Sequence, residues 1–366
     1  MTRIGITGAD GFLGWHLRAF LHAVPDVTVV AAGRDTFADS AKLRTFAGGV
    51  DAIVHLAGAN RGEDRLVRET NIRLADLLAD ACTSAGAAPH VIFANSMHYM
   101  RPTAYARSKV IAAEKLAAWA ATSRATFTNL IMPHVFGEGG RPHYNSAMAT
   151  FCHQIAHGET PRIIEDAELE LLHAQRVAEE IFAIVRDKRS GDARLTGTPI
   201  RVSAALAMLQ RVAAQYAGQL IPEFESPLAL DLFNSYRSYL FPQHYPVELN
   251  MRTDARGSLF EAVKSLHGGQ CFMSTTKPGI TRGNHYHRRK LERFLVVQGE
   301  ALIRVRRLIS GNIVDFRVSG AQPQYVDMPT LHTHNITNTG ATDLITLFWT
   351  QEIFDAANPD TYAEIV

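Results

Sequence analysis

The sequence predicts a doubly wound α/β parallel sheet followed by a separate all-β unit. In the first half, short apolar runs alternate with longer amphipathic segments, which is typical of strand–helix–strand units. A glycine-rich turn, TGADGFLG, follows the first apolar run. From Pro246 onward, short apolar runs are separated by Gly, Asn and Asp turns, which indicates an all-β unit. A chain of 366 residues is also long enough to build two hydrophobic cores.

The first half supplies the elements of a parallel sheet in order. Strands are expected at residues 4–7, 27–32, 52–56, 91–94 and 126–132, with helices at 66–85 and 104–121. This alternation implies a parallel sheet with helices on both faces. After residue 175 the pattern becomes mainly helical, over 175–186 and 204–217.

The second half changes to short strands, expected at residues 301–308, 312–318 and 344–348. The segment FPQHYP at residues 241–246 contains two prolines and predicts a domain boundary. We therefore expect a first domain at residues 1–243 and a second domain at residues 244–366.

The composition is that of a globular protein that binds small molecules. Hydrophobic residues make up 46% of the chain, and the formal net charge is +1 without a long basic block. Cys82, Cys152 and Cys271 are scattered, which suits a reducing compartment. We find no apolar run of about 18 residues, and the chain opens on a strand and a turn rather than a signal peptide. We therefore expect a cytoplasmic protein without a nucleic-acid or membrane partner.

The glycine turn predicts dinucleotide binding on a Rossmann-type sheet. Gly8 permits a tight turn, Gly11 lets the backbone approach a pyrophosphate, and Gly14 lets the following helix pack against the strand. The phosphates would rest on the N-terminus of that helix. At the end of the second strand, Asp35 favours NAD and Arg34 favours NADP, and we expect NADPH.

A second constellation predicts hydride transfer at a carbonyl. Tyr105 and Lys109 lie one helical turn apart, so both side chains share a face. A lysine ammonium beside a phenol lowers the phenol pKa, which suits proton transfer to a carbonyl oxygen. Ser96 follows the strand at 91–94 and would hydrogen bond to that oxygen. A lone Tyr/Lys pair is common by chance, but the serine and the upstream glycines together favour catalysis.

These motifs resemble the extended short-chain dehydrogenase/reductase family of nucleotide-sugar enzymes. The matching segments are TGADGFLG, HLAGANR, Asn71, Ser96, YARSK and PHVFGEGGRPHYNS at residues 133–146. The resemblance implies that Ser96, Tyr105 and Lys109 are catalytic. The cofactor would contact Gly8, Gly11, Gly14, Arg34, Ala57, Tyr105, Lys109 and Pro133. The sugar nucleotide would contact Ser96, His134, Tyr144 and Asn145.

Near the C-terminus, four potential metal ligands fall in two spaced motifs. His285 and His287 alternate along one expected strand, so both point to the same face. Glu292 and His334 would complete a set of three imidazoles and one carboxylate, suited to Zn, Fe, Mn, Ni or Cu. Among 16 histidines a chance H-x-H pair is unsurprising, but four spaced ligands are not. Both motifs resemble the cupin family, which implies a C-terminal cupin barrel holding a divalent metal, with zinc expected first.

The fused order resembles the bifunctional capsular-polysaccharide enzymes on the route to UDP-N-acetyl-L-fucosamine. Residues 141–156, the cupin motifs and the ending FWTQEIFDAANPDTY carry this match. It implies a UDP-linked 4-keto-6-deoxy-N-acetylhexosamine as substrate. The cupin would epimerise C3 and the dehydrogenase would reduce the C4 ketone with NADPH, giving UDP-2-acetamido-2,6-dideoxy-L-talose for capsule or O-antigen synthesis. Both parent families commonly dimerise, and we expect a homodimer.

Two alternatives stay open. One is a single-activity nucleotide-sugar epimerase or reductase whose cupin only binds substrate or metal, with the metal closing the barrel structurally. The other is an NADP or sugar sensor without turnover. The intact set of Ser96, Tyr105 and Lys109 argues against the sensor.

Overall fold

The computed structural model describes residues 1–366, apart from the side chain of Met100. The chain forms two compact units, the first made of residues 1–136 and 168–200, and the second of residues 137–167 and 201–366. The division into domains at residues 1–243 and 244–366, expected from the sequence, stays a prediction. Within the described part of the chain, no helix is both long and apolar enough to cross a membrane.

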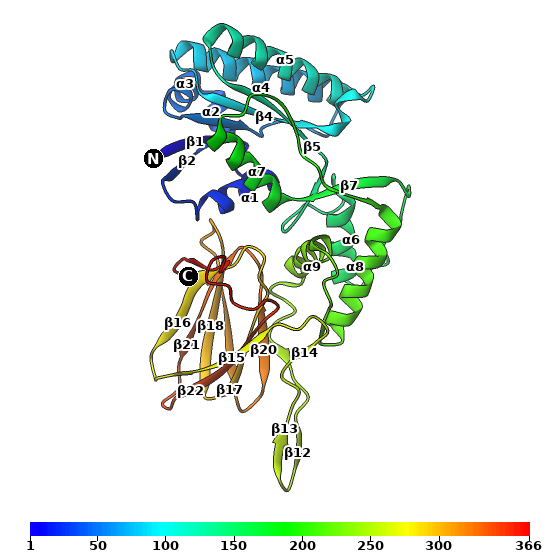
Figure 1. Ribbon diagram of the computed structural model, residues 1–366, viewed down its shortest axis with the longest axis vertical. Coiled ribbons are helices and arrows are strands. Elements are labelled where there is room, and N and C mark those ends of the chain that lie inside the picture. Colours follow the sequence, from blue (N-terminus) through cyan, green and yellow to red (C-terminus); the bar gives the residue numbers. More distant parts are fainter. The chain divides into compact units, whose positions relative to one another are not determined.

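The first unit is built on a six-stranded sheet in the order β2-β1-β3-β4-β5-β8 (Figure 1). All neighbouring strands run parallel, which confirms the predicted Rossmann-type sheet. The strands are β1 (Thr2–Thr7), β2 (Val27–Ala32), β3 (Ala52–His55), β4 (His90–Ser96), β5 (Phe127–Met132) and β8 (Gly191–Arg194). A smaller sheet contains β6 (His134–Phe136), β7 (Glu168–His173) and β9 (Thr198–Arg201).

Two hydrophobic cores show that helices cover both faces of this sheet. One core joins Ile6 and Ile92 of the strands to Leu17 and Ile181, and the other joins Ile53 to residues of the opposite helices. The first face carries α1 (Phe12–Leu21) and α7 (Ala174–Asp187). The second carries α3 (Ser40–Gly48), α4 (Asp64–Ser84) and α5 (Ala104–Ser123), with α4 and α5 side by side (Figure 1). Between β2 and α3 lies the short α2 (Arg34–Ala38).

The second unit contains the predicted cupin barrel, formed by two five-stranded antiparallel sheets around one apolar core. The first sheet comprises β11 (Val247–Glu248), β20 (Gln324–Met328), β17 (Glu292–Gln298), β22 (Leu344–Thr350) and β15 (Gln270–Thr276). The second comprises β19 (Ile313–Ser319), β18 (Glu300–Arg307), β21 (His332–Asn338), β16 (Thr281–Tyr286) and β23 (Tyr362–Ala363). Side chains alternate between the core and the surface along these strands, as on β19.

Three helices belong to the same unit as the barrel. They are α6 (Ala147–Ala156), α8 (Val202–Ala217) and α9 (Pro227–Leu240). Two short strands, β10 (Leu220–Ile221) and β14 (Lys264–Ser265), pair in parallel. The exposed hairpin of β12 (Arg252–Asp254) and β13 (Gly257–Leu259) projects from the barrel (Figure 1).

A buried polar network joins α8 to the barrel. Arg293 makes two hydrogen bonds to Asp327, at 2.7 and 2.9 Å, and both side chains are almost fully buried. The Tyr216 hydroxyl, on α8, donates to Asp327 at 2.6 Å and lies 2.6 Å from the Tyr245 hydroxyl. Burial works to raise the pKa of Asp327, but the facing Arg293 guanidinium lowers it overall. The carboxylate is therefore held charged by its partners.

We expect Arg293→Ala to lower the free energy of unfolding by about 3–5 kcal/mol, because it leaves the buried Asp327 carboxylate without its salt-bridge partner. Urea denaturation followed by circular dichroism measures the change. The control is Arg304→Ala, since Arg304 and Asp315 form an ion pair at 3.5 Å with about half of each side chain exposed. That exposed pair should contribute about 0–1 kcal/mol. Equal losses in the two variants would contradict the assignment.

Candidate functional site

The glycine turn has the geometry of a phosphate cradle. Gly8 adopts φ +68°, and a Cβ there would lie 2.9 Å from the Ala57 nitrogen. A Cβ on Gly14 would lie 2.3 Å from the Gly8 carbonyl oxygen, so only glycine lets α1 pack this close to the turn. Gly11 is the N-cap of α1. Backbone N–H groups at the start of this helix are therefore available to an anion.

Two more predicted cofactor residues follow neighbouring strands of the sheet. Arg34 is exposed at the start of α2, directly after β2 and Gly33. Ala57 follows β3, and its N–H donates to the Thr7 hydroxyl at 3.2 Å. Because β1, β2 and β3 are adjacent and parallel, their carboxyl ends share one edge of the sheet. Ligands of open α/β sheets bind beyond this edge.

The three predicted catalytic residues line one cavity of about 260 Å³ in the first unit. Ser96 ends β4, while Tyr105 and Lys109 lie in the first two turns of α5, whose N-cap is Thr103. Pro133 also lines this cavity. The Ser96 Oγ accepts the His98 N–H at 3.2 Å, so the serine hydroxyl proton is left for another acceptor. This arrangement is suited to holding a carbonyl oxygen.

Burial governs the protonation of this site. It lowers the pKa of the Lys109 ammonium to about 8 and raises the pKa of the Tyr105 phenol. The expectation that the Tyr105 pKa is lowered is thus wrong, because desolvation of the buried phenol raises it. Tyr105 is consequently protonated at neutral pH, which is the form that donates a proton to a ketone.

The predicted substrate residues fall in different places. His134, on β6, lies close to the cavity residues Pro133 and Val135 in sequence, and its Nε2 is 3.1 Å from the Nε2 of His98. Tyr144 and Asn145 lie in the loop before α6, which belongs to the second compact unit. Their role toward a substrate stays a prediction.

The four predicted metal ligands converge inside the barrel. His285 lies on β16 directly opposite His334 on β21, His287 follows β16, and Glu292 begins β17 of the other sheet. The candidate ligand atoms all lie within 4.8 Å of one another. Tyr286, between two of the ligands, instead stacks on the Tyr362 ring with centroids 5.2 Å apart.

The hydrogen bonds made by these four residues indicate that the cluster can bind a cation. His287 Nδ1 donates to the Asp360 carbonyl at 2.6 Å, and His334 Nδ1 donates to the His332 carbonyl at 3.1 Å. Each ring therefore presents an Nε2 lone pair, and these nitrogens lie 3.0 and 3.1 Å from Glu292 Oε2. Lone pairs facing a carboxylate at this distance repel each other unless a positive charge lies between them. Burial lowers the pKa of His334 to about 4, so the ring is neutral and able to ligate a metal at neutral pH.

Asp360 supports the loop between two of the candidate metal ligands, His287 and Glu292. Its buried carboxylate accepts the backbone N–H groups of Arg288, Arg289 and Lys290 at 2.8–3.1 Å, between His287 and Glu292. Sequence reasoning missed this residue because it follows His287 by 73 positions and belongs to no local motif.

We expect Asp360→Asn to lower metal affinity by about 10–100-fold, as do other substitutions of residues that hold metal ligands in place. Both carboxylate oxygens of Asp360 accept backbone N–H groups, and asparagine would replace one of these oxygens by an NH₂ group, which cannot accept. Metal content after dialysis against a graded chelator measures the effect. The control is Asp355→Asn, an exposed aspartate of the same segment whose carboxylate accepts the Ala357 N–H. Unchanged affinity in the Asp360 variant would show that the loop holds its shape without the carboxylate.

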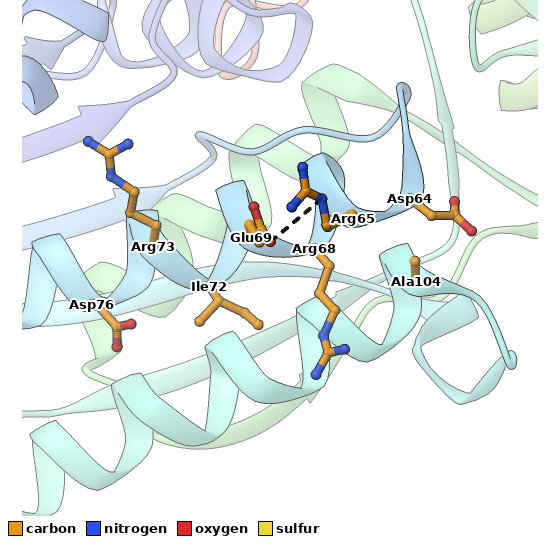
Figure 2. Close-up of a pocket in the computed structure, with 8 residues that line it drawn as sticks. All are labelled: Asp64, Arg65, Arg68, Glu69, Ile72, Arg73, Asp76 and Ala104. Carbon is orange, nitrogen blue, oxygen red and sulfur yellow. Dashed lines mark ion pairs between the residues drawn. The ribbon is translucent and has the colours of Figure 1, made fainter.

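A further hollow lies along α4 and contains none of the predicted site residues (Figure 2). Figure 2 shows exposed charged side chains on its walls, including Arg65, which pairs weakly with Glu69 at 4.0 Å. We interpret it as a solvated helix face.

Comparisons with known proteins agree with this geometry. Residues 4–196 match the NAD dependent epimerase/dehydratase family, and residues 252–362 match the polysaccharide biosynthesis C-terminal domain. UDP-2-acetamido-2,6-beta-L-arabino-hexul-4-ose reductase of Pseudomonas aeruginosa is 32% identical over 99% of this chain and 98% of its own length.

Solved structures give the same result. The capsular polysaccharide assembling protein CapF from Staphylococcus aureus is 31% identical, with a TM-score of 0.63 over 100% of both chains. RMD from Pseudomonas aeruginosa, solved with NADPH, shares the fold over 66% of this chain and 99% of its own, at 18% identity and a TM-score of 0.58. The chain therefore belongs to the NAD dependent epimerase/dehydratase family and, over its full length, to the family of the Pseudomonas reductase and CapF.

Proposed function

We propose that the chain is a bifunctional nucleotide-sugar enzyme that epimerises and then reduces a UDP-4-keto-6-deoxy-N-acetylhexosamine. The barrel would invert C3, and the first unit would reduce the C4 ketone with NADPH to UDP-2-acetamido-2,6-dideoxy-L-talose. The cavity that Ser96, Tyr105 and Lys109 line together carries the proposal. The relative named for reducing a UDP-linked hexulose supports the substrate class, and CapF supports a role in capsule synthesis.

In the reduction, two hydroxyl groups would hold the ketone oxygen. Ser96 would donate a hydrogen bond to the C4 oxygen, and Tyr105 would donate a hydrogen bond and then its proton. NADPH, when bound at the glycine turn, supplies the hydride for C4. The ketone thus gains a hydride at carbon and a proton at oxygen and becomes an alcohol. Lys109, one turn from Tyr105, would stabilise the phenolate that remains.

In the barrel, the C4 ketone acidifies the adjacent C3–H. A base takes this proton, the C–H electron pair moves toward the C4 oxygen, and a proton returns to the opposite face of C3. His285, His287, Glu292 and His334 would hold a divalent cation, expected to be zinc, which when bound acts as a Lewis acid. Three of these residues, His285, His287 and Glu292, line a cavity of about 440 Å³ with room for a sugar.

Loss of NADPH absorbance with a UDP-4-keto-6-deoxy-N-acetylhexosamine tests the reduction, and C3–deuterium exchange in D₂O without NADPH tests the epimerisation. We expect both reactions with the wild-type chain, and epimerised product when NADPH is present. Oxidation of NADPH without C3 exchange would reduce the proposal to a single activity. If no such ketone is turned over, the proposed substrate class is wrong.

We expect Arg34→Ala to raise the KM for NADPH by about 10–100-fold, because a charged hydrogen bond to the 2′-phosphate contributes about 1.5–3 kcal/mol. The KM for NADH should barely change, since that cofactor lacks the phosphate. Initial rates with both cofactors measure the split. Arg44→Ala, which removes an exposed arginine of α3, is the matched control. Equal changes for NADH and NADPH would favour Asp35 and NAD instead.

A further inference from the structure

The register of the barrel sheet places a glutamine in the same row as a metal ligand. Gln270 on β15 pairs with Thr350 on β22, and Thr350 pairs on its other side with Glu292 on β17. Paired residues of adjacent strands point to the same face, and strands lie about 4.8 Å apart. Gln270 therefore faces the ligand cluster across one strand, and all three side chains line the same cavity.

The orientation of the Gln270 carboxamide is fixed by its surroundings. Its Oε1 accepts the Phe354 N–H at 2.7 Å, and only the oxygen end of an amide can accept that bond. The NH₂ end must then point elsewhere, and it makes no hydrogen bond to the described part of the chain. Thr350 has no free hydrogen-bond donor, because its hydroxyl donates to the Glu352 carbonyl at 2.8 Å. Of Gln270, Thr350 and Glu292, only Gln270 therefore has hydrogen-bond donors available to a ligand.

The other side chains that line this cavity explain why the Gln270 amide would bind a sugar. The next row along the same three strands is aromatic, formed by Phe272, Phe348 and Phe294. Phe272 and Phe348 stack with centroids 5.0 Å apart. An apolar wall with a few convergent polar groups is typical of a small-molecule site.

We propose that Gln270 is a substrate-contacting residue of the barrel, donating from its amide nitrogen to an oxygen of the sugar held against the ligand cluster. This inference rests on the proposed epimerisation. When the C3 proton leaves, negative charge develops on the C4 oxygen, and a preorganised amide donor stabilises that charge. Gln270 would also select sugars that carry an acceptor at this position.

Gln270→Glu is the sharpest variant, because it keeps the volume and the acceptor for the Phe354 N–H but removes both donors. We expect its C3–deuterium exchange to fall by about 100-fold, the usual cost of one such donor. Metal content and NADPH oxidation with an already epimerised ketone should be unchanged. Gln270→Met removes the donors without adding a charge and should show a similar loss. Gln298→Glu, the same change at an exposed position on β17, is the control.

A binding measurement separates this inference from the proposed function. The side-chain amide resonances of Gln270, assigned by their absence in Gln270→Met, should shift when UDP-N-acetylglucosamine is added to the full-length protein as purified, without chelator. That shift without C3 exchange would support the contact and overturn the epimerisation. Full exchange in Gln270→Met, or a loss confined to Gln270→Glu, would overturn the role of the amide while leaving the epimerisation standing.

Discussion

Tyr105→Phe should lower the rate of NADPH oxidation by about 10²–10⁴-fold, the usual contribution of a positioned general acid. Phenylalanine keeps the ring that lines the cavity but has no proton to give the ketone oxygen. Because burial raises the pKa of the Tyr105 phenol, the wild-type residue is a proton donor across the neutral range. Single-turnover absorbance measurements with saturating ketone isolate the chemical step.

Two accompanying measurements make this result specific. NADPH affinity should stay close to that of the wild-type chain, because the phosphates are expected at the glycine turn on α1. The C3–deuterium exchange assigned to the barrel should also persist in Tyr105→Phe. Ser96→Ala should lower the rate less, since Tyr105 remains to hold the ketone oxygen and deliver the proton. Undiminished NADPH oxidation in Tyr105→Phe would remove the tyrosine from its assigned role.

Local spacing was sufficient to predict that the three proposed catalytic residues lie together in one cavity. Ser96 ends a strand, and Tyr105 and Lys109 are one helical turn apart, so short-range periodicity already constrains where these side chains point. The candidate metal ligands His285, His287 and Glu292 were predictable for a similar reason, because they lie close together in sequence around the connection between two successive strands. His334 was predicted only from its resemblance to the second cupin motif. Where the residues are close in sequence, a few residues of regular structure determine the geometry, whereas the position of His334 opposite His285 depends on the pairing of β21 with β16.

Features that depend on distant pairings could not be predicted from the sequence. The Tyr216 hydroxyl reaches Asp327, 111 positions later, and Gln270 is oriented by Phe354, 84 positions later. The direction of the Tyr105 pKa shift was also mispredicted, because this pKa depends on how deeply tertiary packing buries the phenol. Burial and long-range register are properties of the folded chain and leave no periodic signal in the sequence.

Replacing His285 and His287 together by alanine should remove the metal and with it the C3–deuterium exchange. Substituting a residue that hydrogen bonds to a metal ligand lowers metal affinity by about 10–100-fold. Loss of two direct ligands must therefore lower metal affinity further. The remaining pair, Glu292 and His334, cannot hold a divalent cation tightly. Elemental analysis of the purified chain should find about one divalent metal ion per chain in the wild type and far less in the variant.

The same variant distinguishes a catalytic metal from a structural one. If the metal serves the epimerisation, the variant keeps its circular dichroism spectrum and still oxidises NADPH with an already epimerised ketone. If the metal closes the barrel, the variant loses its cooperative unfolding transition as well, because metal binding free energy is then folding free energy. His157→Ala, at an exposed histidine after α6, controls for the loss of an imidazole. Metal content equal to the wild type would show that these two histidines are not ligands, whereas exchange that survives full metal loss would leave the barrel chemistry to its protein side chains alone.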